Sequence, residues 1–159
     1  MKLALTIFTA IFFSVTSAMA QTNRNVSQYN LAAGVGLGSY DPVAVFPEGG
    51  SAAKKGLDEF RVIHSGVTYL FANAENAKTF EANPEKYEPT YGGWCAYAMG
   101  KRTGSKVRIQ PTLFTIHGNR AHYFVARSAK AEFDADIAGF EANADVNWTR
   151  ISGESPRGQ

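Results

Sequence analysis

The alternation of apolar and polar residues predicts two β-hairpins in this chain. Short apolar runs separated by two residues rich in glycine, serine or asparagine are typical of strands joined by tight turns. The strands and their central turns are residues 59–64 and 67–71 around Ser65-Gly66, and residues 113–117 and 122–125 around Gly118-Asn119. We therefore expect an antiparallel sheet that is built from hairpins.

A helical segment is predicted after each hairpin. Asn73 is a suitable N-cap for a helix over residues 74–82. Asn83-Pro84 ends this helix and starts a short further turn, because proline fits the first position of a helix. Residues 129–144 also have a helical pattern, and Gly139 favours a break that divides it into two pieces.

These elements together predict a single α+β domain. A small antiparallel sheet of hairpins should pack against two or three short helices. The aromatic content of 13% can build a firm core without a disulfide. No internal repeat of a period typical of repeat architectures is visible.

The first twenty residues have the pattern of a secretory signal peptide. Lys2 precedes an apolar run over residues 3–15, and Ala18-Met19-Ala20 is a small-x-small cleavage site. The alternative is a retained membrane anchor, although the run is short for a bilayer span. We expect a periplasmic or secreted protein, cleaved after Ala20 and free of the membrane. The predicted organisation is a signal peptide at 1–20, a flexible lead-in at 21–38, a domain at 39–150 and a polar tail at 151–159.

The charge balance changes little when the predicted signal is removed. The chain has 16 basic and 14 acidic residues, and the signal contains one of the basic residues, Lys2. A net charge this close to zero argues against a nucleic-acid partner and against a polybasic membrane-binding patch. A metal ion or a small molecule is the kind of partner that remains.

Cys95 is the only cysteine, so an exported chain cannot form an internal disulfide with it. Residues 91–101 can form a helix on which Tyr91, Cys95 and Met99 share one face. A thiolate and a thioether one turn apart are soft donors that suit a copper ion in the Cu(I) state. The alternative is that both sulfur-containing side chains are core residues. A third metal ligand could come from one of the histidines, which are His64, His117 and His122.

Aromatic residues also predict a cleft for a small organic ligand. Structural roles are the alternative for these residues, since Asp41-Pro42 is a natural turn start. The sequence contains no serine-nucleophile elbow, phosphate loop or paired catalytic carboxylates, so no catalytic residue is assigned. A thiol-dependent enzyme or redox sensor based on Cys95 would need a base beside the thiol. The residues expected to line the cleft are Tyr40, Asp41, Tyr91 and Trp94.

Several of these motifs, taken in order, resemble the YHS domain, and in particular its secreted bacterial branch. The resemblance runs from about Tyr29 to Trp148 and implies a single domain behind a signal peptide. The motifs that carry it are Gly38-Ser39-Tyr40-Asp41-Pro42-Val43-Ala44, Gly66-Val67-Thr68-Tyr69-Leu70-Phe71, Glu75-Asn76, Phe80, Asn83-Pro84-Glu85-Lys86-Tyr87 and Tyr91-Gly92-Gly93-Trp94-Cys95-Ala96-Tyr97.

The resemblance implies heavy-metal handling for some members of the family, which carry cysteines in Asp-Pro-Val-Cys-Gly-Met and Tyr-x-Phe-Cys motifs. Ala44 and Ala72 stand at those two cysteine positions here, so both thiols of that pattern are missing. The expectation is therefore an exported YHS-type binding protein that binds copper through Cys95. The alternative is a small-ligand or protein-interaction module in which Cys95 is structural.

Overall fold

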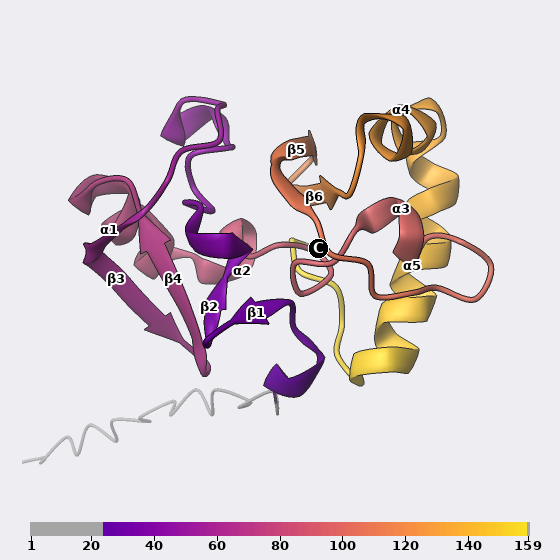
Figure 1. Cartoon of the computed structure of the whole chain (residues 1–159), viewed down its shortest axis with the longest axis horizontal. Coiled ribbons are helices and arrows are strands. Elements are labelled where there is room, and N and C mark those ends of the chain that lie inside the picture. Colours follow the sequence, from indigo (N-terminus) through magenta and orange to yellow (C-terminus); the bar gives the residue numbers. More distant parts are fainter. Residues whose placement is uncertain (1–23, 159) are drawn as a thin grey trace, which may run out of the picture.

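Two units, each made of a β-hairpin followed by helices, form most of the structure (Figure 1). The computed structural model describes residues 24–158, so the predicted signal peptide and its cleavage site lie outside the described residues. The first unit contains β3 (Leu57–His64), β4 (Val67–Phe71), α1 (Ala74–Ala82) and α2 (Pro84–Tyr87). The second contains β5 (Gln110–His117), β6 (Arg120–Phe124), α4 (Arg127–Ala135) and α5 (Ile137–Ser152).

The two units repeat at a constant spacing of 53 positions. Leu57 and Gln110 begin β3 and β5, and the same spacing separates both ends of β4 from those of β6 and both ends of α1 from those of α4. Even the register shifts in the two hairpins correspond, at Leu57/Arg61 and at Gln110/Phe114. The sequence showed no such repeat, because most of the matched positions carry different residues.

The two units carry sheets of different size. In the first, β1 (Leu31–Ala32) and β2 (Val35–Gly36) extend the hairpin into four strands in the order β1-β2-β4-β3. The second keeps a two-stranded antiparallel sheet, β5-β6. The predicted α+β class is confirmed, although the larger sheet is mixed because β2 runs parallel to β4.

The local signals for the first unit are confirmed. The Asn73 side chain accepts a hydrogen bond of 2.8 Å from the backbone N–H of Asn76 and so caps α1. Pro84 takes the first position of α2, as expected from its fixed φ and missing N–H.

Two helix predictions in the second half of the chain are wrong in their bounds. The expected helix over residues 91–101 is reduced to α3 (Ala96–Met99), because Gly92 and Gly93 adopt left-handed φ angles of 59° and 83°. The break between α4 and α5 falls at Asp136 rather than at Gly139. Asp136 caps α5 by accepting a 3.0 Å hydrogen bond from the N–H of Gly139, where a Cβ atom would collide with that carboxylate.

Both terminal segments belong to the fold. The residues predicted as a lead-in contain β1 and β2 and the buried Tyr29, and the residues predicted as a polar tail contain the buried Glu154 and Arg157. The hydroxyl of Tyr29 donates a 2.7 Å hydrogen bond to Glu154, and Arg157 donates to the same carboxylate at 2.9 Å. These contacts hold the two ends of the described chain together.

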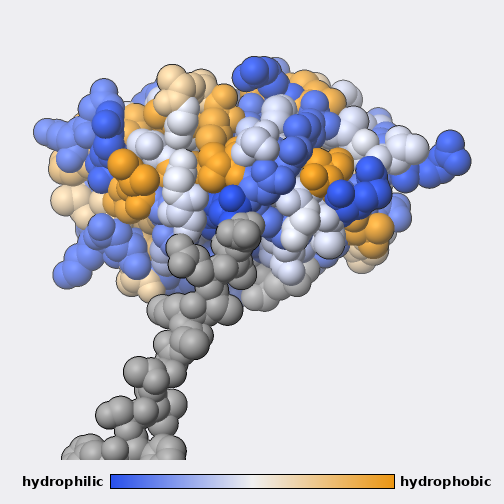
Figure 2. All heavy atoms as spheres, turned by 90° about the horizontal axis from the view of Figure 1, so that it is seen from below, coloured by the Kyte–Doolittle hydropathy of each residue, from blue (hydrophilic) through white to orange (hydrophobic). Residues whose placement is uncertain are grey.

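One continuous hydrophobic core runs through both units and contains the fully buried Trp148, Phe80 and Phe133. On the face shown in Figure 2, apolar and polar side chains lie in small mixed groups. None of the helices within residues 24–158 is long and apolar enough to cross a membrane.

Candidate functional site

Cys95 lies in the core, where its exposed fraction is 0%. It is the N-cap residue of α3, its N–H donates a 3.0 Å hydrogen bond to the carbonyl of Val107, and it forms a β-bridge with Tyr123. Met99 is equally buried, and its N–H donates to the carbonyl of Cys95 at 2.9 Å. The two residues are therefore one turn apart as predicted, whereas Tyr91 precedes α3 and does not share its face.

The three histidines lie in two different places. His64, at the end of β3, is close to Glu85 and Glu88, whereas His117 and His122 both contact Glu141. Among residues 24–158, the side chains of His64, Glu85 and Glu88 form the only group of three or more His, Cys, Asp or Glu residues close enough to share a metal ion. Cys95 is not part of that group.

The His64 group is already neutralised by arginines. Glu88 is completely buried and forms a bidentate ion pair with Arg24. Arg157 pairs with Glu85 at 2.9 Å and approaches Glu88 at 3.5 Å. Two guanidinium groups would repel a metal cation at this position, so we assign no metal to it.

Asp41 has a structural role at the start of its turn. Its buried carboxylate accepts hydrogen bonds from the backbone N–H groups of Val43 at 2.8 Å, Ala44 at 3.1 Å and Ala72 at 2.8 Å. The side-chain amide of Asn76 donates a fourth hydrogen bond at 2.6 Å. These four hydrogen bonds satisfy the buried carboxylate, so Asp41 ties the turn to β4 and α1.

Cys95 corresponds to Asp41 in the repeat. The N–H of Asp41 donates to Lys54, and the N–H of Cys95 donates to Val107, 53 positions after Lys54. Cys95 itself is 54 positions after Asp41, so the segment from Cys95 to Val107 is one residue shorter than the segment from Asp41 to Lys54. The position 53 after Asn76 is occupied by Ala129. The second unit has thus replaced a hydrogen-bonded carboxylate and amide by a thiol and a methyl group, which favours a packing role for Cys95.

Tyr91 and Trp94 are held by hydrogen bonds elsewhere in the protein. The hydroxyl of Tyr91 donates to Asp145 at 2.8 Å and accepts from Arg120 at 3.1 Å, and the indole N–H of Trp94 donates to the carbonyl of Gln28 at 2.6 Å. Of the four residues expected to line a cleft, Tyr40 lines a cavity that Asp41, Tyr91 and Trp94 do not reach. The aromatic cleft is therefore not assembled as predicted.

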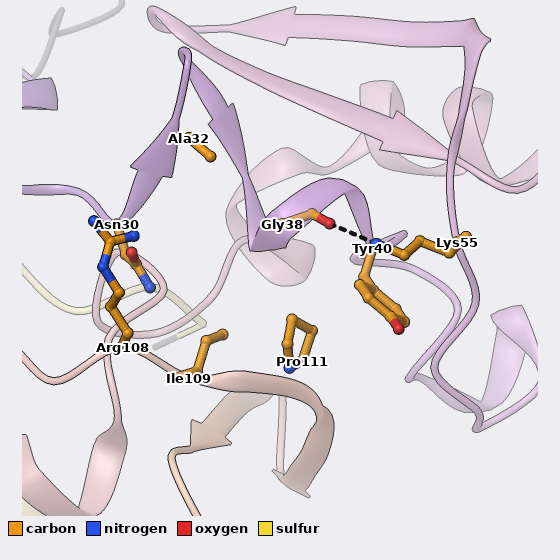
Figure 3. A pocket seen from close by; sticks show the side chains of 8 residues that line it. All are labelled: Asn30, Ala32, Gly38, Tyr40, Lys55, Arg108, Ile109 and Pro111. Carbon is orange, nitrogen blue, oxygen red and sulfur yellow. Dashed lines mark hydrogen bonds between the residues drawn. The ribbon is translucent and has the colours of Figure 1, made fainter.

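The cavity beside Tyr40 has a volume of about 240 Å³ and lies where the two units meet (Figure 3). Its walls come from the segment around β1, from the turn that leads to Tyr40, and from the chain that enters each hairpin. The lining residues are Asn30, Ala32, Gly38, Tyr40, Lys55, Arg108, Ile109 and Pro111.

Two cations face this cavity, and none of its lining residues within 24–158 is acidic. The ammonium group of Lys55 lies 4.2 Å from the centre of the Tyr40 ring and donates a 2.9 Å hydrogen bond to the carbonyl of Gly38. Arg108 is exposed and has no hydrogen bond or ion pair with any of the described residues. Sequence reasoning missed both residues, since a basic residue in a loop is usually only solvated.

A second charged cluster surrounds Glu141, which stands 53 positions after Glu88. The ring of His122 is completely buried and its Nε2 lies 2.7 Å from Glu141, while Nδ1 of the half-exposed His117 lies 3.2 Å from the same oxygen. Burial alone would raise the pKa of Glu141, but the hydrogen bonds with His122 and His117 and the charge of Arg120 outweigh it and lower the pKa to about 2. Burial lowers the pKa of His122. The cluster is therefore built around an ionised glutamate and a neutral buried imidazole.

Comparisons of the chain with family models, with curated proteins and with solved structures found no match.

Proposed function

We propose that this protein is an exported, non-enzymatic binding protein of the YHS type, and that it holds a small ligand in the cavity beside Tyr40. The observation that carries the proposal is the cavity itself, which combines an aromatic ring, apolar walls and a few polar groups at the junction of the two units. Binding sites for small molecules commonly have this composition and this location between structural units. In this proposal Cys95 is a core residue.

The experiment is native mass spectrometry of protein purified from the exported fraction, followed by binding measurements on a cavity-filling variant. Ala32 is exposed and lines the cavity, so Ala32→Leu should fill it without removing a hydrogen bond. Ala138→Leu is the matched control, because Ala138 is exposed on α5 and is not part of the cavity lining. We expect a bound small molecule whose affinity falls in Ala32→Leu and is unchanged in Ala138→Leu.

Equal affinity in Ala32→Leu and wild type would place the ligand elsewhere and contradict the proposal. The intact mass of the same sample tests export, because cleavage after Ala20 removes residues 1–20. A mass that retains those residues would contradict the release of the protein from its signal peptide.

Copper binding through Cys95 is the alternative function. The observation in its favour is that the two sulfur-containing residues Cys95 and Met99 lie one turn apart along the backbone. Sulfur donors of this kind suit Cu(I). Competition with a chromogenic Cu(I) chelator tests it, as described below for variants of Cys95.

A further inference from the structure

We infer that the ligand of the cavity is a short molecule with an acidic group at each end, of the α,ω-dicarboxylate class. This inference rests on the proposed function, because it concerns the same cavity. It is carried by the relationship between Lys55 and Arg108, which the sequence motifs did not single out.

Lys55 and Arg108 are counterparts in the two units. They are 53 positions apart, and each stands two residues before the strand that opens its hairpin, at Leu57 and Gln110. The preceding residue is anchored in the same way in both units, since the carbonyls of Lys54 and Val107 accept the corresponding hydrogen bonds from Asp41 and Cys95. The repeat therefore brings one cation from each unit to the same cavity.

The two cations approach from opposite sides. Figure 3 shows Arg108 on the side of Asn30 and Lys55 above Tyr40 on the other side, with Ile109 and Pro111 between them. A single compact anion in contact with one of them would leave the other without an anionic partner. A molecule with two separated anionic groups can pair with both.

The charge of the cavity is not compensated by the protein. Within residues 24–158, no acidic residue lines it and Arg108 has no ion pair, and Lys55 contacts a carbonyl oxygen and an aromatic ring. A concave site lined by charges of one sign raises the local concentration of ligands of the opposite sign. The ligand should therefore be anionic. Carboxylates are suitable anionic groups, because a guanidinium can bind a carboxylate in a bidentate geometry.

The space between the cations sets the size and polarity of the ligand's middle part. Apolar groups of Ala32, Ile109 and Pro111 border it, which favours a short carbon chain. A cavity volume of about 240 Å³ is below the roughly 300–1,000 Å³ of sites for drug-sized ligands, so it favours a short molecule.

Isothermal titration calorimetry at low ionic strength tests this with matched pairs of ligands. Succinate is compared with butyrate and glutarate with pentanoate, so that each pair differs by one carboxylate, and inorganic phosphate represents a compact anion. We expect each dicarboxylate to bind at least about tenfold more tightly than its monocarboxylate, which is the size of effect that one charged hydrogen-bonding pair provides.

The variants Arg108→Gln and Lys55→Gln should each remove most of this difference. Arg127→Gln is the control, because it removes the same charge from an exposed residue at the start of α4 outside this cavity. We expect less than about a twofold change for it, given the screening of exposed charges.

Equal affinities for the two members of each ligand pair would overturn the inference, as would phosphate binding more tightly than either dicarboxylate. A neutral ligand that is recovered from the exported protein and weakened by Ala32→Leu would also overturn it, while leaving the proposed function intact. If Ala32→Leu does not weaken the binding of any ligand, both the dicarboxylate inference and the proposed function are contradicted.

Discussion

The thiol of Cys95 stands in the second unit where the carboxylate of Asp41 stands in the first. Both backbone N–H groups donate to the chain that enters the following hairpin, at Lys54 and at Val107. The side-chain partner of Asp41 is Asn76, and the position 53 residues after Asn76 in the second unit is Ala129. In the first unit this position is part of a hydrogen-bonded network, whereas in the second it is occupied by a side chain packed in the core.

Replacing Cys95 by serine should therefore destabilise the protein. A buried hydroxyl placed in an apolar environment would lower the free energy of unfolding by about 1–3 kcal/mol, measured by urea denaturation. Met99→Leu keeps the volume of its side chain, so it should cost less than about 1.5 kcal/mol. If Cys95→Ser were as stable as wild type but lost Cu(I) to a chelator that wild type resists, copper binding would replace the packing role.

Asp41 and Asn76 should show a large coupling in a double-mutant cycle. Each single substitution, Asp41→Ala or Asn76→Ala, leaves a buried polar partner behind, whereas the double variant removes both members of the 2.6 Å contact. We expect a coupling free energy between about 0.5 and 3 kcal/mol. The cycle is measured by thermal or urea unfolding, and additive effects would show that the contact does not contribute.

Arg24 should be essential for stability although it lies near the start of the described chain. Its side chain is 4% exposed and pairs with the fully buried Glu88. Arg24→Gln should lower the free energy of unfolding by as much as about 3 kcal/mol, because it leaves a buried carboxylate with less compensation. This expected loss is at the lower end of the range for breaking a buried ion pair, because Arg157 remains 3.5 Å from Glu88.

The control for Arg24 is Lys130→Gln, which removes an i,i+4 ion pair with Asp134 on the partly exposed surface of α4. Such pairs contribute about 0.3–0.5 kcal/mol. Equal effects of the two substitutions on the urea midpoint would rule out a structural role for the N-terminal ion pair.

Stability should fall as the pH is lowered from 7 to 5, because of His122. Burial lowers its pKa below the ordinary value of 6.5, so the unfolded chain binds a proton at a pH where the folded protein does not. The stability contributed by the neutral imidazole is present above pH 6.5 and is lost as the pH falls towards its folded pKa, by up to about 1.4 kcal/mol per pH unit.

His122→Gln should flatten this dependence, because glutamine keeps a donor for Glu141 and does not titrate. The titratable and charged groups around His122 are Glu141 from α5, His117 from β5 and Arg120 from β6. The carboxylate of Glu141, with a pKa of about 2, stays ionised throughout this range. Urea titrations at several pH values measure both proteins, and parallel curves would show that another group controls the acid response.

Much of the fold was predictable where the signal is local. The Ser65-Gly66 turn, the Asn73 cap and Pro84 at the start of α2 each act through neighbours within a few residues, so the sequence specifies them directly. The bounds of α3 and of the α4–α5 break were predicted wrongly. They depend on the backbone of Gly92-Gly93 and on the close approach of Asp136 to Gly139, which hydrophobic periodicity does not report.

The sequence by itself determined the two hairpins, the α+β class and the presence of a single cysteine among apolar neighbours, because turn chemistry, alternation and composition are properties of short segments. Tertiary structure alone decided that Cys95 replaces Asp41, that Arg24 meets Glu88, and that Lys55 and Arg108 face one cavity. These pairs are more than 50 positions apart. Which distant loops meet is decided by how the two units share one core, and no pattern within either segment encodes that contact.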